Sequence, residues 1–176
     1  ILVDTRRFKV EDHGDFWLSK TPDQVASRGW DAALHRIASW VIVHDRQEDR
    51  RFAMINTHFD HRGRRARAES AKLIVKKLQG LAHLPTMVTG DLNSAESTRP
   101  IKTLKAAGLR DTLRVIHPEA TEVGTFGGFK GKRSGAKIDY VLADQRWEVK
   151  AAEIVHDNRE GRFPSDHYPV TATLTL

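Results

Sequence analysis

Polar side chains with useful chemistry end or interrupt several apolar segments of this sequence. Asp91 and Asn93 follow the apolar segment 86–89 after a single glycine. Residues i and i+2 of an extended chain point the same way, so these two side chains are expected to face one site. A carboxylate can take a proton or position water, and an amide can donate to a phosphate oxygen. The alternative for this pair is an Asx turn that only closes the strand.

Asp139 lies in the otherwise apolar segment 138–142. Burying a carboxylate is costly unless it has a partner. A histidine is a suitable partner, because the carboxylate holds the imidazole in one tautomer, as in a catalytic dyad. The alternative is a buried ion pair with a lysine or arginine.

Asp166 and His167 directly precede the last predicted strand and lie between Pro164 and Pro169. Both side chains can reach one site only if the backbone forms a loop there, and the two prolines disfavour regular strand pairing. A histidine can act as general acid or base, or bind a phosphoryl oxygen as a cation. Aspartate is a hard oxygen ligand suited to Mg²⁺. The alternative is a surface loop with a salt-bridged histidine.

His58 ends a predicted strand and shares a face with Met54 and Asn56. Taken alone, a histidine at this position is more often a packing or surface residue. Together, however, the polar residues fit one scheme, in which carboxylates hold a divalent metal and an aspartate positions a water molecule. Histidine and asparagine would then stabilise a phosphoryl group. Oxygen ligands in a chain without cysteine favour Mg²⁺ or Mn²⁺ over zinc.

The elements that position these residues follow from hydrophobic patterning. Apolar stripes at helical spacing predict helices over 64–82 and 99–107. Most strands alternate, which suits sheets with one face on a core and the other covered by helices. We therefore expect an α/β fold, a layered sandwich of two mixed or antiparallel sheets flanked by helices. Strands are predicted over 1–4, 8–10 and 16–18, with a turn at 13–15, and over 37–44, 52–59, 86–89, 137–143, 147–155 and 170–176.

Length and composition fit one domain spanning residues 1–176, because no linker or repeat divides the 176 residues. The 29 basic and 23 acidic residues leave a net charge of +6, which is compatible with an anionic partner such as nucleic acid or a phosphorylated small molecule. The absence of cysteine excludes a disulfide framework and thiolate metal sites. No apolar run approaches the roughly 18 residues of a membrane-spanning helix.

Four motifs occur in a fixed order along the chain, and the segment 29–37 accompanies them. The motifs are Ile55-Asn56-Thr57-His58-Phe59-Asp60-His61, Gly90-Asp91-Leu92-Asn93, Ile138-Asp139-Tyr140-Val141 and Ser165-Asp166-His167-Tyr168-Pro169-Val170. In this combination the sequence resembles the endonuclease/exonuclease/phosphatase superfamily, which has the DNase I-like fold, and more closely a bacterial branch of it. The resemblance covers essentially the whole chain. It implies a two-sheet α/β sandwich that hydrolyses phosphate esters with Mg²⁺.

The resemblance also implies roles for the polar residues. Asp91 would orient or deprotonate the attacking water, and Asn93 would contact the scissile phosphate. His167, oriented by Asp139, would stabilise the phosphoryl oxygens. His58 would be a second histidine on the phosphate side.

Two further roles follow from the same resemblance. Asp166 would bind the metal or support its site, and Arg36 is a weaker candidate for binding substrate phosphate. The substrate is expected to be a nucleic acid or a small phosphate ester.

The sequence also departs from the family pattern. The family domain begins with a strand that bears an asparagine and a second strand that bears a metal-ligating glutamate, and neither motif is present. Glu11 lies in a different context. We therefore expect the domain to be incomplete at its N-terminus, by about a third of a domain of common size, which would leave sheet edges and apolar surface uncovered.

Three other interpretations compete with this one. A dinuclear metallophosphoesterase needs Gly-Asn-His and Gly-His elements, and no glycine here precedes histidine or asparagine. A basic nucleic-acid-binding domain would use Arg64, Arg65 and Arg67, but it does not explain the polar residues at the strand ends. A degenerate relative would keep the fold and lack the metal.

Overall fold

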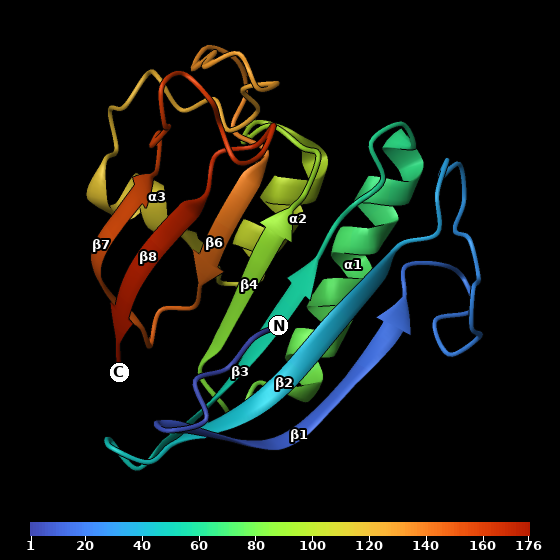
Figure 1. Ribbon diagram of the computed structural model, residues 1–176. Helices are drawn as coiled ribbons and strands as arrows, with labels where there is room; N and C mark the ends of the chain where they lie inside the picture. Colours follow the sequence, from blue (N-terminus) through green and yellow to red (C-terminus); the bar gives the residue numbers. More distant parts are fainter.

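The structure, a computed structural model, describes residues 1–176 as two β-sheets and three helices (Figure 1). A six-stranded sheet has the order β1-β2-β3-β4-β6-β5, and a two-stranded sheet pairs β7 with β8. The strands are β1 (Phe8–Trp17), β2 (Ile37–Asp45), β3 (Arg50–Thr57), β4 (Thr86–Asp91), β5 (Arg110–Asp111), β6 (Asp139–Ala143), β7 (Glu148–Ile154) and β8 (Val170–Thr175), and the helices are α1 (Arg64–Gly80), α2 (Arg99–Ala106) and α3 (Thr112–Ile116).

The topology of the large sheet brings three strand ends to one edge. Strands β3 and β4 are parallel, and α1 forms the crossover between them. Strand β6 runs antiparallel to β4, with Asp139 paired to Asp91. The carboxyl ends of β3 and β4 therefore lie beside the amino end of β6, at the upper edge of the sheet in Figure 1.

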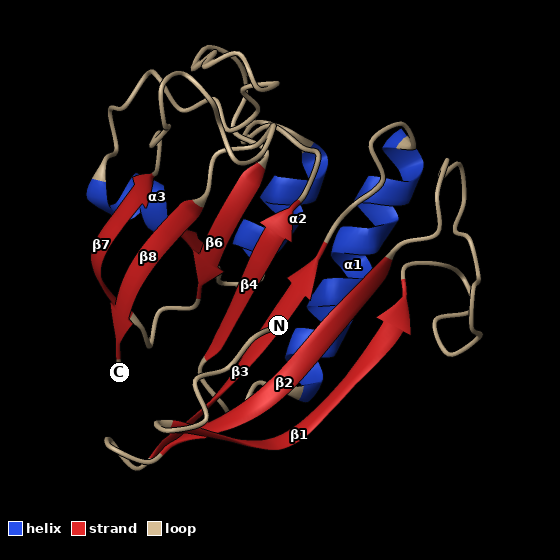
Figure 2. Ribbon diagram, in the orientation of Figure 1, coloured by secondary structure: helices blue, strands red, loops and turns tan.

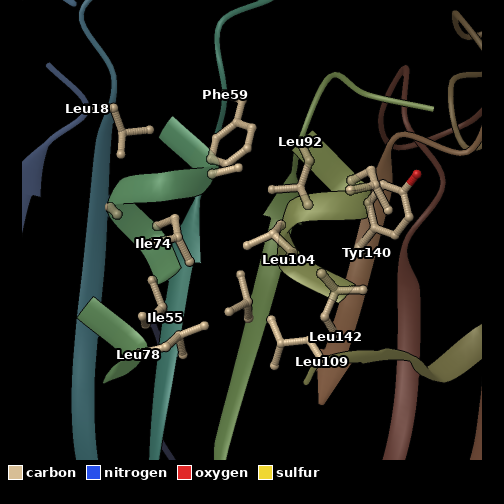
Figure 3. Packing of buried hydrophobic residues seen from close by; sticks show 14 of the residues in the cluster. Leu18, Ile55, Phe59, Ile74, Leu78, Leu92, Leu104, Leu109, Tyr140 and Leu142 are labelled. Atoms are coloured by element: carbon tan, nitrogen blue, oxygen red, sulfur yellow. The ribbon is translucent and has the colours of Figure 1, made fainter. Parts of the chain in front are cut away.

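Helices α1 and α2 cover one face of the six-stranded sheet (Figure 2). The main core lies between this face and the two helices. Figure 3 shows Ile55, Leu92 and Leu142 from the strands and their C-terminal extensions meeting Ile74 of α1 and Leu104 of α2. All five side chains are fully buried, and each stabilises the fold by about 1.5–3 kcal/mol relative to an exposed side chain.

The smaller sheet has its own set of buried side chains. Leu113 of α3 packs with Val123 and with Ala152 of β7 in a cluster separate from the main core. Strand β8 shows the alternation expected of a half-buried strand. None of the three helices has the length and hydrophobicity needed to cross a bilayer.

The structure confirms the predicted layered α/β architecture with two sheets. Helices α1 and α2 begin at the predicted residues, and β2 and β3 form the predicted antiparallel pair. The predicted alternation along β3 is also correct, because Ala53 and Ile55 are fully buried in the core.

The prediction for the N-terminal region is wrong. Residues 8–17 form one continuous strand, β1, and not two short strands around a turn at 13–15; residues 1–4 form no strand. Strand β1 pairs with β2 along its whole length, with an irregularity between Val10 and Asp12. Gly14 lies in this strand against the ring of Trp40 in β2, so the glycine permits close packing and does not make a turn.

Candidate active site

The close approach of two strand ends builds the centre of the candidate site. Gly90 has a φ of +133°, a region that side chains disfavour. A Cβ atom at this position would lie 1.8 Å from the carbonyl oxygen of Thr57. Because glycine has no side chain, the end of β4 can lie directly against the end of β3. His58, which follows β3, is thereby placed beside Asp91.

Asp91 lies at the centre of the candidate site and contacts both histidines and Asn93. Its Oδ2 atom lies 3.1 Å from Nε2 of His58 and 4.0 Å from Nε2 of His167, and its Oδ1 accepts a hydrogen bond of 2.8 Å from the backbone N–H of Asn93. Partial burial raises the pKa of Asp91, but the hydrogen bonds from His58 and the Asn93 backbone, with the nearby histidines, hold it below its ordinary value. Asp91 is therefore ionised at neutral pH.

The side chain of Asn93 stabilises the loop that follows Asp91 by hydrogen bonds. Its backbone adopts a φ of 44°, which asparagine tolerates better than most residues. Its Nδ2 donates hydrogen bonds of 3.0 Å to the carbonyl of Phe59 and 3.2 Å to Oδ2 of Asp91. The amide thus links the ends of β3 and β4 and holds the carboxylate in place.

His167 and Asp139 form a second pair at the same edge. Nδ1 of His167 lies 2.8 Å from Oδ2 of Asp139 at the start of β6. Burial raises the pKa of Asp139, against the opposing effect of its hydrogen bonds with Thr125 and His167. Partial burial lowers the pKa of His167, but the hydrogen bond and charge of Asp139, together with two further aspartates, raise it above its ordinary value. His167 is therefore available as a hydrogen-bond donor at Nε2.

A cavity of about 370 Å³ opens beside these groups. Asp91, Asp139 and His167 line it at one end. Asn56 and Thr89, joined by a hydrogen bond of 2.9 Å from Nδ2 to Oγ1, line it further along β3 and β4. The charged groups of the site thus have open space next to them.

The donor atoms at this edge fit a hard divalent cation. Asp91, Asp139 and His167 each offer an atom within 4.8 Å of the others. Asp166, the metal ligand expected from the sequence, is not part of this group, although it is close enough for its charge to raise the pKa of His167. Carboxylate oxygens without any thiolate suit Mg²⁺ or Mn²⁺, so the donor chemistry fits the expected metal.

Arg36 lies at the same edge but outside the cluster. It immediately precedes β2, where Ala38 pairs with Thr57 at the end of β3. No ion pair or side-chain hydrogen bond joins Arg36 to Asp91 or His58, and its buried Nε has no hydrogen-bond partner.

Two supporting residues were not predicted from the sequence. Thr125 is fully buried, and its Oγ1 accepts hydrogen bonds from the backbone N–H groups of Ile138 (3.0 Å) and Asp139 (3.2 Å). Asp60 accepts backbone hydrogen bonds from two separate segments, residues 33–34 and 62–63. Asp60 lies within the first motif, where its polarity in a buried setting could have revealed it. Thr125 lies in an irregular segment without such a signal.

Comparison with known proteins identifies the family of this chain. A model of the endonuclease/exonuclease/phosphatase family matches residues 8–167, a range that includes both strand ends and the His167–Asp139 pair. The chain belongs to this family. No curated protein sequence matches the chain significantly.

Solved structures of several similar proteins superpose closely. A family protein from Bacteroides thetaiotaomicron is 34% identical, with a TM-score of 0.88 over 97% of this chain and 66% of that one. A mannosyl-6-phosphatase from Bacteroides thetaiotaomicron VPI-5482 is also 34% identical, with a TM-score of 0.87 over 98% of this chain and 68% of that one. An Enterococcus faecalis V583 protein of unknown function is 30% identical, with a TM-score of 0.88 over 98% and 68%. The chain thus spans about two thirds of the length of these relatives.

Proposed function

We propose that this protein is a metal-dependent hydrolase of phosphate esters. The observation that carries the proposal is the convergence of His58 and His167 on the ionised carboxylate of Asp91. Membership of the endonuclease/exonuclease/phosphatase family supports the same reaction class. The phosphatase relative at 34% identity supports a phosphorylated substrate.

In this proposal, Asp91 orients the attacking water. Its depressed pKa makes it a weak base, but the ionised carboxylate still accepts hydrogen bonds, so its first role is to hold the water by a hydrogen bond. The hydrogen bonds from Asn93 keep the carboxylate in a single orientation. Preorganisation of this kind lowers the cost of reaching the transition state.

His167 binds the phosphoryl group. Donation from Nδ1 to Asp139 leaves Nε2 to donate a hydrogen bond to a phosphoryl oxygen. The raised pKa of His167 favours the cation, which stabilises the negative charge that develops on those oxygens. His58 is more than half exposed at 53%, and its Nε2 faces Asp91, so a second hydrogen bond to the phosphoryl group would come from its Nδ1 in the cationic form of the ring.

A bound Mg²⁺ or Mn²⁺ would polarise the phosphoryl oxygens and neutralise part of their charge. The carboxylates of Asp91 and Asp139 are the groups of this chain that would hold it. The fit rests on their hard oxygen donors. In the proposal, Asp166 supports the metal site from the adjoining loop, where its charge acts on His167. In the proposal, Arg36 assists by binding substrate phosphate at the edge of the site.

The test measures hydrolysis of p-nitrophenyl phosphate and bis(p-nitrophenyl) phosphate by the intact protein with Mg²⁺. We expect turnover of at least one ester, and its loss with EDTA and in Asp91→Ala. Asp157→Ala is the matched control, because Asp157 is exposed. The comparison between the two esters separates a phosphatase from a phosphodiesterase. A folded protein that hydrolyses neither ester nor any nucleic acid with Mg²⁺ or Mn²⁺ would contradict the proposal.

A further inference from the structure

A second cavity, of about 360 Å³, lies next to the candidate active site. It is formed where the first turns of α1 and α2 meet the loop that follows β4. Asn93 lines it, and Asn93 is hydrogen-bonded to Asp91. The second cavity therefore adjoins Asn93, which holds Asp91, the residue that orients the attacking water in the proposed function.

The lining of this cavity is strongly basic. One carboxylate, Glu69, also lines it, but Lys72 forms an ion pair of 2.8 Å with that carboxylate. No ion pair within the chain neutralises the guanidinium groups. Planar guanidinium groups bind both phosphate and carboxylate oxygens with two parallel hydrogen bonds, and a cluster of such cations suits the higher negative charge of a phosphate monoester. The four basic residues are Arg64, Arg65, Arg67 and Arg99.

The basic character of this cavity comes from arginine side chains and not from free backbone N–H groups at the start of α1. Asp31 already accepts hydrogen bonds from the backbone N–H groups of Arg65 (3.1 Å) and Ala66 (2.6 Å) at the start of α1. Arg67 donates one bond of 2.8 Å to the carbonyl of Asp60, which fixes its side chain at the cavity. Arg65 and Arg99 are exposed and have no acceptor within the chain.

Ser94 provides an independent indication of a ligand. It lines the cavity, is only 4% exposed, and its buried Oγ has no hydrogen-bond partner. Buried polar atoms in folded proteins nearly always have a partner. The hydroxyl of Tyr140 holds the carbonyl of Ser94 at 2.7 Å, so the backbone here is fixed and the serine hydroxyl remains available.

We propose that this arginine cavity is a subsite for a second phosphate group of the substrate, adjacent to the ester that is hydrolysed. The inference rests on the proposed phosphate-ester hydrolysis and narrows its substrate to molecules that carry a second phosphate group near the ester that is hydrolysed. A nucleotide chain and a sugar bisphosphate share this chemistry. Asn93 links the two positions, since it touches the second cavity and Asp91 at once.

The kinetic test compares substrates that differ only by a second phosphate. We would measure kcat/KM of the intact protein with Mg²⁺ for the dinucleotide TpT and for pTpT, which carries an added 5′-phosphate. A second pair, glucose 6-phosphate and glucose 1,6-bisphosphate, represents small sugars. We expect at least a tenfold preference for the doubly phosphorylated member of one pair, and which pair shows it identifies the source. The preference should fall to less than threefold in the double variant Arg65→Ala/Arg99→Ala.

The matched control is Lys76→Ala/Lys102→Ala. It removes the same charge from the same two helices, at exposed positions outside the cavity, and should keep the preference. Equal kcat/KM within both pairs would overturn the subsite. An equal loss of the preference in the control would also overturn it, because the effect would then reflect overall charge.

A binding measurement separates failure of the subsite from failure of the proposed function. Calorimetric titration without metal would compare thymidine 3′,5′-bisphosphate with thymidine 5′-monophosphate. We expect the bisphosphate to bind at least tenfold more tightly, and the arginine double variant to lose this difference. If no ester is hydrolysed but this result is obtained, the subsite stands and the proposed reaction fails. If the two nucleotides bind equally, the subsite is wrong regardless of activity.

Discussion

Nδ1 of His167 and Oδ2 of Asp139 lie 2.8 Å apart although 28 positions separate the two residues in the sequence. Asp139 begins β6, and His167 lies in the loop that leads into β8. The hydrogen bond therefore ties the loop before the small sheet to the edge of the large one. It also decides which imidazole nitrogen faces Asp91, since Nε2 is 4.0 Å from that carboxylate.

Asp139→Asn tests this relationship. An amide has the shape of the carboxylate but not its charge, so His167 loses the partner that fixes its tautomer and favours its cation. We expect kcat to fall by about 100-fold or more, with KM changed only a few-fold. The measurement is steady-state kinetics with Mg²⁺, accompanied by circular dichroism to verify folding. A folded variant that keeps more than a third of wild-type kcat would show that the pair is structural.

Asp91 and His58 should contribute unequally. Asp91 contacts both histidines and the Asn93 loop, whereas His58 is more than half exposed. We expect Asp91→Asn to lower kcat by about 1,000-fold and His58→Ala by about tenfold, because an exposed donor is partly replaced by water. The check is kcat/KM for both variants on one ester. Similar losses in the two variants would mean that His58 has a central role that its exposure does not suggest.

Thr125 is predicted to be a positioning residue. Thr125→Val keeps the volume but removes the hydroxyl that accepts from two backbone N–H groups beside Asp139. We expect a loss of about 1–3 kcal/mol in the free energy of unfolding, together with a fall in kcat at unchanged KM. Thr125→Ser retains the hydroxyl and should restore kcat. If Thr125→Ser is as slow as Thr125→Val, packing and not the hydrogen bonds determines the effect.

Asp60 should make stability depend on pH. It is almost fully buried, and although burial raises its pKa, four backbone hydrogen bonds lower it far below the ordinary value. A group whose pKa is depressed in the folded state stabilises the protein above its unfolded pKa of about 3.9, and this stability is lost as the pH falls below that value. We expect the free energy of unfolding in urea to decrease between about pH 5 and pH 2.

Asp60→Asn is the variant that assigns this pH dependence. An amide nitrogen cannot accept the backbone hydrogen bonds that one carboxylate oxygen accepts, so we expect a loss of about 2–4 kcal/mol at neutral pH. The variant should also show a shallower decrease in acid. Asp23→Asn, at an exposed position, should leave the pH profile unchanged. If the free energy of unfolding of Asp60→Asn decreases in acid as steeply as that of the wild type, other carboxyl groups cause the pH dependence.

Much of the fold and of the site could be predicted from the sequence, because both depend on local patterns. The alternation along β3 and the apolar stripe of α1 follow from burial on one face. Most proposed site residues stand out because they end, follow or interrupt an apolar segment. The elements β5 and α3 were missed because two and five residues are too few to show a period. Their formation depends on pairing with β6 and on an Asp111 cap.

The features of the site that the sequence did not predict were missed for a common reason. Thr125 acts through hydrogen bonds to a strand that follows it by more than ten residues, and no local pattern encodes that contact. The arginine cavity depends on α1 and α2 meeting beside Asn93, so the sequence shows only a basic helix. The cluster of possible metal-binding side chains also depends on such pairing, since the register of β4 with β6 brings Asp91 beside Asp139.

The contact between Gly90 and the carbonyl of Thr57 has a consequence for the evolution of this site. Every missense change in the glycine codon introduces at least a methyl group at a position where a carbonyl oxygen already stands. We therefore expect substitutions at position 90 to disturb the separation between His58 and Asp91, whereas the surrounding loops can change without altering it. A deep mutational library should show this as a single permitted amino acid at position 90 next to tolerant loop positions.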